Sequence, residues 1–321
     1  MSTQQPMTIQ LGTGKYGELL VRCRSLSPVP TAVVHPCERN ALAGAAEAAE
    51  HGLIEPVFIG PRARIAQVAD EACIDLDSEQ IIDAPHSHAA AATAVELVRA
   101  GRAEMLMKGS LHTDELLGAV VARDSGLRTE RRISHVFIMD VPTYHKVLVV
   151  TDAAINIAPS LEDKVDICQN AIDLARVLGR EQPKVAIVAA GETVSSKMPA
   201  TIDAAALCKM AERGQIRGGV VDGPLAFDNA ISADAAQRKG IQSRVAGDPD
   251  ILLVPDLESG NILAKLLSYL AHADGAGLVL GARVPIVLTS RADSVRARVA
   301  SCAVAMLIAH ARRAAGAMAL A

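Results

Sequence analysis

The sequence predicts an α/β protein whose strands form doubly wound, mostly parallel sheets. Short apolar runs rich in Val and Ile recur along the chain, and longer Ala- and Leu-rich segments with helical spacing separate them. Within each short run the apolar residues are continuous rather than alternating, which is typical of strands covered by helices on both faces. The 321 residues are enough for two domains of this class, each with its own core.

The expected strands are the short apolar runs, bounded by polar residues, Gly or Pro. In chain order they are Thr31–His35, Pro56–Ile59, Met105–Met107, Ser134–Ile138, Val147–Val150, Lys184–Ala189, Gly219–Val221, Ile251–Val254, Gly277–Leu280 and Ile286–Leu288. The expected helices lie between them, at Glu38–His51, Ser87–Ala100, Asp114–Ala122, Leu161–Leu178, Ile202–Arg213, Gly260–Ala271 and Asp293–Arg312. Strands and helices therefore alternate along the chain, which is the order of a doubly wound fold.

A domain boundary is expected at Asp152–Leu161, where polar residues and a proline interrupt the apolar pattern. Ser160 can cap the helix that follows, with Asp163 in its first turn. No Gly/Ser linker separates the two parts, so we expect them to sit against each other with a ligand site in the cleft between them.

Composition excludes a sequence-independent nucleic-acid binder. Thirty-two Lys and Arg residues against 36 Asp and Glu give a net charge of −4, too close to neutral for a general polyanion clamp. Aromatic residues make up 2% of the chain and Trp is absent, which leaves few surfaces for stacking bases.

The sequence predicts a cytoplasmic protein without a membrane span. The first ten residues lack the pattern of a secretory signal, and the longest uncharged apolar stretch, 299–309, is about half a bilayer span. The six cysteines are scattered without a CxxC pair, as expected of reduced thiols. His86 and His88 are a close histidine pair without a matching ligand cluster, so we read them as a helix start and predict no metal.

Gly12–Gly17 matches the GxGxxG dinucleotide fingerprint, with Glu38 at about the spacing of a ribose contact. That mechanism needs a buried strand to deliver the loop, and only the short run 8–11 precedes it. An N-terminal turn before a helix is therefore the favoured interpretation, and dinucleotide binding is the alternative.

The strand Met105–Met107 ends in a loop with the composition of an anion site. This loop offers a lysine, a glycine, hydroxyls and the free N–H groups of a helix start. The candidate residues are Lys108, Gly109, Ser110, His112 and Thr113. The alternative is a capped turn without a ligand.

Loops of similar composition follow strands in the second half, at the strand ends where open α/β sheets bind ligands. The candidates are Gly191, Ser195, Ser196, Lys197, Asp222, Gly223, Asp256, Ser259, Gly260 and Asn261. After the last strand come Ser290 and Arg291, a hydroxyl and a planar fork that matches phosphate oxygens. The alternative there is that Asp293 caps the helix and Arg291 is solvated. Arg132, in an arginine cluster with Arg123, Arg128 and Arg131, offers a second anion contact or a solvated basic face.

These motifs resemble the phosphate acetyltransferase/phosphate butyryltransferase family over nearly the whole chain. In the second half the resemblance lies in DGPLAFDNAIS at 222–232, PDLESGN at 255–261 and PIVLTSRADS at 285–294. Upstream, MKGSLHTDELL at 107–117, GLRTERRISHV at 126–136 and TDAAINIAP at 151–159 look closer to phosphate butyryltransferases and to the phosphotransacetylase part of bifunctional enoyl-CoA hydratase/phosphate acetyltransferases.

The resemblance implies the reaction acyl-CoA + phosphate ⇌ CoA + acyl phosphate, with acyl-CoA and inorganic phosphate as partners and no separate cofactor. It implies two three-layer α/β domains of the isocitrate/isopropylmalate dehydrogenase type, with the C-terminal segment closing the first: residues 1–151 plus 278–321, and residues 152–277. It also implies a homodimer, and a catalytic pair in which Ser290 hydrogen-bonds near the CoA sulfur and Arg291 holds phosphate.

One departure concerns the general base. Acetyltransferases of the family carry an aspartate seven residues after the serine, where this chain has Ala297. The alternatives are a catalytically dead acyl-CoA-binding or regulatory module, and a dehydrogenase on the same fold. The acyl chain, acetyl or butyryl, depends on the volume of the pocket.

Overall fold

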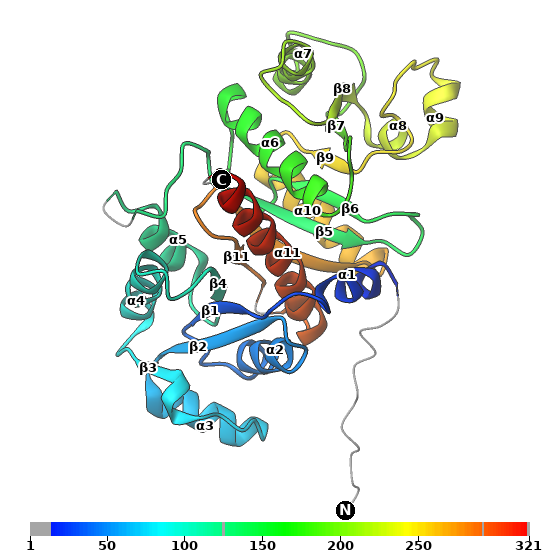
Figure 1. The fold of residues 1–321 in the computed structure, drawn as a ribbon. Helices are drawn as coiled ribbons and strands as arrows, with labels where there is room; N and C mark the ends of the chain where they lie inside the picture. Colours follow the sequence, from blue (N-terminus) through cyan, green and yellow to red (C-terminus); the bar gives the residue numbers. More distant parts are fainter. Residues whose placement is uncertain (1–13, 124–125, 291, 320–321) are drawn as a thin grey trace, which may run out of the picture.

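The strands of the computed structural model, which describes residues 14–123, 126–290 and 292–319, form one continuous sheet (Figure 1). In the order in which they lie side by side, the described strands are β3 (Ile81–Asp83), β2 (Ile54–Gly60), β1 (Val29–Val34), β4 (Met105–Lys108), β11 (Ile286–Val287), β10 (Asp274–Leu280), β5 (Ser134–Asp140), β6 (Leu148–Thr151), β9 (Ile251–Leu253), β7 (Lys184–Val188) and β8 (Val220–Leu225). Most neighbouring pairs are parallel. The antiparallel pairs lie at the centre, where β10 pairs with β11 and β5, and β5 with β6. The predicted mostly parallel sheet is confirmed.

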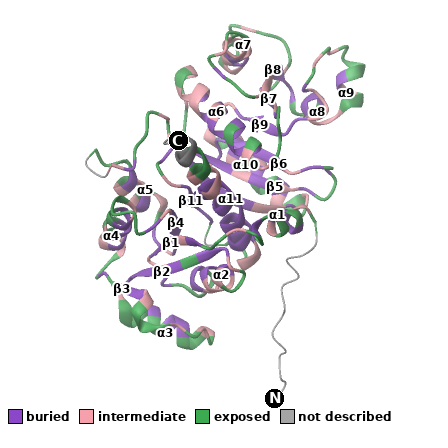
Figure 2. Ribbon diagram, in the orientation of Figure 1, coloured by how far each residue is buried: buried purple, intermediate pink, exposed green. Residues whose placement is uncertain are grey.

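Helices cover both faces of this sheet. They are α1 (Lys15–Cys23), α2 (Arg39–Glu50), α3 (Arg62–Ala72), α4 (Ser87–Arg99), α5 (Thr113–Val121), α6 (Leu161–Val177), α7 (Pro199–Glu212), α8 (Phe227–Ile231), α9 (Ala233–Arg238), α10 (Leu257–Leu270) and α11 (Val295–Ala319), with a short 3₁₀ turn at Ser78–Gln80. Side chains of α1, α2, α3, α6, α7 and α11 share one continuous core on the first face. The second face has two separate cores, one under α4 and α5 and the other under α8 and α10. The buried residues accordingly concentrate in the strands and in the helix faces that meet them (Figure 2).

The expected boundaries differ from the structure in several places. Asp222 and Gly223 belong to strand β8 rather than to a loop, and Pro224 is tolerated there because β8 is an edge strand with no neighbour on its far side. Helix α10 begins at Leu257, because Asp256 already caps it, so Ser259–Asn261 are helical rather than a loop. The sequence prediction omitted β3, α3, α8 and α9, which are short or polar elements at the rims.

The expected helix start at Ser160 is confirmed. The Ser160 hydroxyl accepts from the backbone N–H of Asp163 at 3.2 Å, and the Asp163 carboxylate accepts from the backbone N–H of Ser160 at 3.0 Å. This reciprocal capping box satisfies two N–H groups that the first turn of a helix otherwise leaves free. The domain limits at 151/152 and 277/278 stay a prediction, and the sheet itself continues across both.

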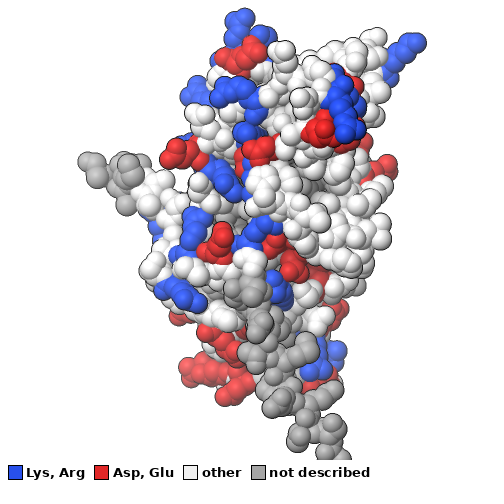
Figure 3. Space-filling view, turned by 90° about the vertical axis from the view of Figure 1, so that its right-hand side faces the viewer, with Lys and Arg blue, Asp and Glu red and all other residues white. Residues whose placement is uncertain are grey.

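On the face that Figure 3 shows, positive and negative side chains are interspersed rather than gathered into one field. No helix in the described ranges is both long and apolar enough to cross a bilayer. All six cysteine thiols are free, and burial raises the pKa of Cys23 to about 11 and that of Cys168 to about 12.

Candidate active site

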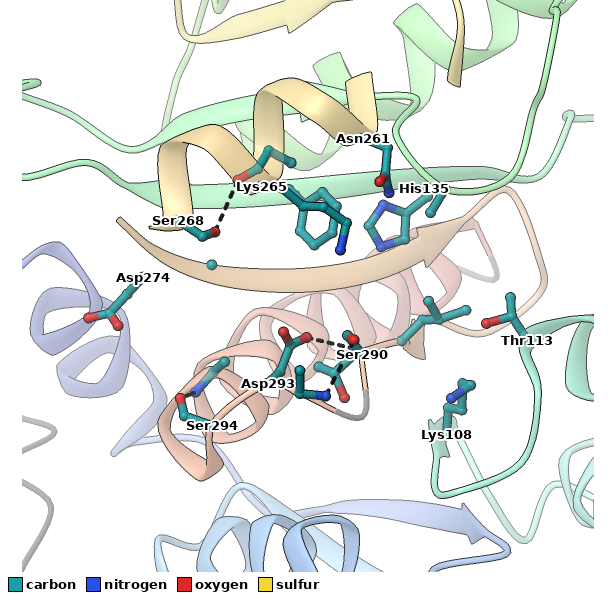
Figure 4. Close-up of a pocket in the computed structure, with 18 of the residues that line it drawn as sticks. Lys108, Thr113, His135, Asn261, Lys265, Ser268, Asp274, Ser290, Asp293 and Ser294 are labelled. Atoms are coloured by element: carbon teal, nitrogen blue, oxygen red, sulfur yellow. Dashed lines mark hydrogen bonds between the residues drawn. The ribbon is translucent and has the colours of Figure 1, made fainter. Parts of the chain in front are cut away.

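A cavity of about 610 Å³ opens on the second face of the sheet, where the helix group α4–α5 ends and the group α8–α10 begins. Strands β5 and β10 form its floor, and the loop from β11 to α11 closes one side (Figure 4). Its polar lining consists of Lys108, His112, Thr113, His135, Asn261, Lys265, Ser268, Tyr269, Asp274, Thr289, Ser290, Asp293 and Ser294. Its apolar lining includes Leu111, Phe137, Ala154, Ala264, Ala273, Leu288 and Ala297. The cavity thus takes residues from both predicted domains.

The loop that follows β4 supplies one wall. Lys108 is buried, and it lines the cavity together with His112 and Thr113 at the start of α5. Position 109 requires glycine for packing, because a Cβ there would lie 2.4 Å from the carbonyl oxygen of Val34 on β1. Ser110 points away from the cavity: its hydroxyl donates to the carbonyl of His35 at 2.8 Å and accepts from the N–H of Cys37. Three of the five predicted residues therefore face the site, and two fix the loop to β1.

The opposite wall is the loop from β11 to α11. Ser290 is exposed to the cavity, and its backbone N–H donates to the carboxylate of Asp293 at 2.6 Å. Asp293 also faces the cavity (Figure 4). Ala297, where the family's acetyltransferases carry their aspartate, lies one helical turn further on the same side. The prediction for Arg291 falls outside the described residues.

Asp293 is the partly buried carboxylate of this wall. Burial raises its pKa, an effect that the N–H of Ser290 and the positive charges of Arg298, Lys265 and Lys108 offset only in part. The other cavity carboxylate, Asp274, is more exposed and forms an ion pair with Arg296 at 3.0 Å. Asp293 is therefore the better placed of the two to exchange a proton inside the cavity.

A buried arginine holds the loop that carries Ser290. The guanidinium of Arg298 donates to the hydroxyl of Thr289 at 2.6 Å and to the carbonyl of Ser290 at 2.9 Å. Its aliphatic stem packs against Gly44 of α2, where any Cβ would lie 2.5 Å from the Arg298 Cδ. Arg298 thus ties the position of Ser290 to the core of the first face.

Helix α10 supplies the third wall. Asp256 caps it by accepting from the N–H and the hydroxyl of Ser259, each at 2.8 Å, so these two residues build the helix start. Gly260 allows a close approach, since a Cβ there would lie 2.6 Å from the carbonyl of Asp152. Asn261 reaches the cavity and donates to the carbonyl of Ala153 at 3.1 Å.

The floor of the cavity carries a histidine that sequence reasoning missed. His135, Phe137 and Met139 alternate along β5 toward the second face, while Val136 and Ile138 enter the core of the first. The carboxylate of Asp152 accepts from the backbone N–H of His135 at 3.1 Å and from the N–H groups of the loop 154–156. A lone histidine in an otherwise apolar, buried strand was the signal available in the sequence. Lys265 carried no such signal, because a lysine on a long helix is ordinary.

The other predicted residues lie outside this cavity. Gly191, Ser195, Ser196 and Lys197 are in the loop between β7 and α7, where the N–H of Ser195 donates to the hydroxyl of Thr201. Asp222 and Gly223 lie in the neighbouring edge strand β8. Arg132 is half-exposed, and it contacts Asn156 at 2.9 Å and Asp163 at 3.3 Å. A substrate role for these residues stays a prediction.

The glycine motif near the N-terminus leads into a helix. Gly14 has a φ of 80° and precedes α1, whose first N–H, on Lys15, donates to the carboxylate of Asp140 at 2.9 Å. The Lys15 ammonium pairs with the same carboxylate at 2.7 Å. The described part of the motif, Gly14–Gly17, therefore binds a protein carboxylate in the position that a phosphate would need. This arrangement favours the N-terminal turn over dinucleotide binding.

The histidine pair also builds a helix start. The Nδ1 of His86 accepts from the backbone N–H of Ala89 at 3.2 Å at the start of α4, and His88 lies 3.4 Å from Glu115. Across residues 14–123, 126–290 and 292–319, no group of three or more His, Cys, Asp or Glu side chains is placed to hold a metal ion.

Comparison with known proteins identifies the family. The chain is 64% identical to a phosphate acetyltransferase of Rhizobium meliloti over 94% of this chain and 95% of that one. It is 39% identical to a phosphate butyryltransferase of Clostridium acetobutylicum over 92% and 98%. The fold matches a crystal structure of a branched-chain phosphotransacylase from Enterococcus faecalis with a TM-score of 0.75 and 32% identity, over 87% of this chain and 99% of that one. This match confirms the predicted dehydrogenase-like, two-domain α/β class. Residues 86–306 match the model of the phosphate acetyl/butyryl transferase family, and the chain belongs to that family.

Proposed function

We propose that this chain transfers an acyl group between CoA and inorganic phosphate, acyl-CoA + phosphate ⇌ CoA + acyl phosphate, in the cavity between α5, α10 and α11. One observation carries the proposal: Ser290 and Asp293, a hydroxyl and a carboxylate, face the lysines Lys108 and Lys265 across one cavity. The lysine ammonium groups can bind the phosphate oxygens, and the carboxylate can accept the proton of the CoA thiol. Membership of the phosphate acetyl/butyryl transferase family supports the same reaction.

The reaction needs proton transfer and charge stabilisation, and the lining supplies groups for both. The CoA thiol gives its proton to Asp293, and the sulfur attacks the carbonyl carbon of the acyl phosphate. The C=O electron pair moves to the oxygen and returns as phosphate leaves with the electrons of the C–O bond. In reverse, phosphate attacks the thioester and Asp293 returns the proton to the sulfur. Lys108, Lys265 and, as the family resemblance implies, Arg291 neutralise the phosphate, while Ser290 hydrogen-bonds near the sulfur.

Acetyl-CoA is the first substrate to test. The relative at 64% identity is named for acetyl transfer, and those named for butyryl transfer are 39% to 44% identical. The apolar part of the cavity, built from alanines and from Leu111, Phe137 and Leu288, accommodates a short alkyl chain. The proposed substrates are acyl-CoA and inorganic phosphate, and the proposal involves no separate cofactor. We also propose a cytoplasmic location; the free cysteine thiols support it.

The function is tested by thiol release. Purified protein is mixed with acetyl-CoA or butyryl-CoA and phosphate, and free CoA is titrated with a thiol reagent. We expect phosphate-dependent release with the wild type. Replacement of Arg291 with alanine is expected to raise the phosphate KM and to lower kcat at least tenfold, because the planar guanidinium fork to phosphate is lost. Release without phosphate dependence, or no release with either thioester, would contradict the function; unchanged kinetics in the variant would contradict the role of Arg291.

We propose further that two copies associate through helix α10. Ile262, Leu266, Tyr269 and Leu270 form one apolar stripe along this helix, with 47% to 76% of each residue exposed. An exposed apolar stripe of this kind marks a surface for protein association. In a two-fold dimer the same patch of both copies packs together, so the stripe would bury itself against its own copy.

The dimer is tested by charging the stripe. Light scattering of the wild type should give twice the 33.5 kDa chain mass. Leu270→Asp should give the monomer, because it places a carboxylate where the partner's apolar side chains would pack. The matched control is Val21→Asp on α1, which is 57% exposed on another surface and should stay dimeric. A monomeric wild type, or a dimeric Leu270→Asp variant, would overturn the proposal.

A further inference from the structure

The imidazole of His135 stands out among the groups that line the cavity. The side chain is fully buried, yet neither ring nitrogen has a hydrogen-bond partner within the protein. The carbonyl of Leu288 lies near the ring but does not complete a hydrogen bond. Figure 4 shows the ring pointing into the cavity between Asn261 and Thr113, on the side opposite Ser290 and Asp293. A buried polar group without a partner costs roughly 1–3 kcal/mol, so a purely packing role would be better filled by an apolar side chain.

The surroundings keep this imidazole uncharged and fixed in place. Burial lowers its pKa, and the negative charge of Asp152 offsets this only in part. The ring packs edge-on against Phe137, with 4.4 Å between ring centroids, and Gly277 leaves room for it on β10. The backbone of His135 pairs with Val279 of β10, its carbonyl accepts from the Thr151 hydroxyl of β6 at 2.9 Å, and its N–H donates to the Asp152 carboxylate. A neutral imidazole offers one N–H donor and one acceptor, both preorganised here.

We infer that His135 donates a hydrogen bond from its ring N–H to the carbonyl oxygen of the acyl group and stabilises the negative charge that develops there during transfer. This inference rests on the proposed function and adds a catalytic residue to it. The charged parts of the substrates have cationic partners elsewhere in the cavity, in Lys108 and Lys265. The carbonyl is the substrate group that starts neutral and becomes negative, and a fixed neutral donor in a site of low polarity acts on such a group with little reorganisation.

The first test observes the hydrogen bond without turnover. Acetyl-CoA labelled with ¹³C at the carbonyl is bound to each protein without phosphate, and its carbonyl stretch is recorded by isotope-edited infrared spectroscopy. A donated hydrogen bond lowers the stretching frequency relative to that of the thioester in an apolar solvent. We expect this shift in the wild type and not in His135→Ala. The control is His51→Gln, which changes an exposed histidine in the turn between α2 and β2 and should keep the shift. If the shift persists in His135→Ala, backbone N–H groups hold the oxygen and the inference is wrong.

The second test measures rates. His135→Ala should lower kcat by about 10²–10³-fold with little change in KM, because the hydrogen bond strengthens mainly in the transition state. His135→Gln places an amide N–H near the position of Nε2, and His135→Asn near that of Nδ1. One of the two should recover at least tenfold of the loss and so identify the donating nitrogen. Equal losses in all three variants would indicate packing or base catalysis and overturn the inference. An inactive wild type with a normal infrared shift would instead contradict the proposed function.

Discussion

Replacement of Asp293 with asparagine is expected to lower kcat for acyl transfer by about 10²–10³-fold at neutral pH, the range that general-base catalysis contributes in enzymes. Asparagine retains an oxygen that can accept from the Ser290 N–H, so the loop keeps its turn while the base is lost. Because a catalyst cannot move the equilibrium, kcat/KM should fall by the same factor in both directions of the reaction.

The pH dependence separates a lost base from a disturbed loop. With its raised pKa, Asp293 in the wild type becomes protonated as the pH falls from neutral, so activity should fall on the acidic side of the profile. In the asparagine variant the CoA thiol must ionise unaided. Its pKa is about 8.5, and the rate should then rise about tenfold per pH unit up to that value. Rates are measured by thiol titration with acetyl phosphate and CoA between pH 5 and 9.

A matched control is Asp274→Asn, which changes the other carboxylate of the cavity wall. It should leave the shape of the pH profile as in the wild type, because Asp274 is already paired with Arg296. If Asp293→Asn keeps the wild-type profile, or if Asp274→Asn acquires the thiol-limited slope, Asp293 is not the base.

Sequence patterns predicted the elements that bury many consecutive apolar residues. Strands such as Ser134–Asp140 and helices such as Leu161–Val177 appear close to their expected places, because periodicity and capping chemistry are local properties. Strand β8 was assigned as a loop at its C-terminal half because Gly223 and Pro224 are turn residues, and only the sheet order shows that β8 is an edge strand. Local chemistry cannot supply a neighbour relation of this kind.

The site was predicted in part for a related reason. Lys108 ends strand β4, and Ser290 lies just beyond the parallel neighbour β11, so both reach the cavity as expected. The loop at Gly191 also follows a strand and Asp222 lies within one, but these strands, β7 and β8, lie at the far edge of the sheet, away from the cavity. His135 lies near the start of strand β5, and Arg298 lies in the first turn of helix α11. Their roles follow from packing between elements distant in sequence, which a single sequence does not display.

Replacement of Arg298 is the second substitution expected to have a large effect on kcat. Its guanidinium lies beneath the Ser290 loop and bonds Thr289 and the Ser290 carbonyl, and its positive charge lowers the pKa of Asp293 against the stronger effect of burial. Methionine at position 298 fills a similar volume, but it supplies neither the hydrogen bonds to the loop nor the positive charge near Asp293. Lysine keeps the charge and loses the planar fork. The two substitutions therefore separate the positioning of Ser290 from the charge that Asp293 experiences.

For Arg298→Met we expect a loss in kcat on the order of 10²-fold, the scale of a small displacement of reacting groups. We also expect the acidic limb of the pH profile to move to higher pH, because removal of a nearby cation raises the pKa of Asp293 further. Arg298→Lys should lose kcat as the loop loosens but keep the limb near its wild-type position. Thermal unfolding of both variants, followed by circular dichroism, checks that they fold. A limb that stays in place in the methionine variant would show that Arg298 acts on the fold alone, since a purely structural role lowers the rate at every pH alike.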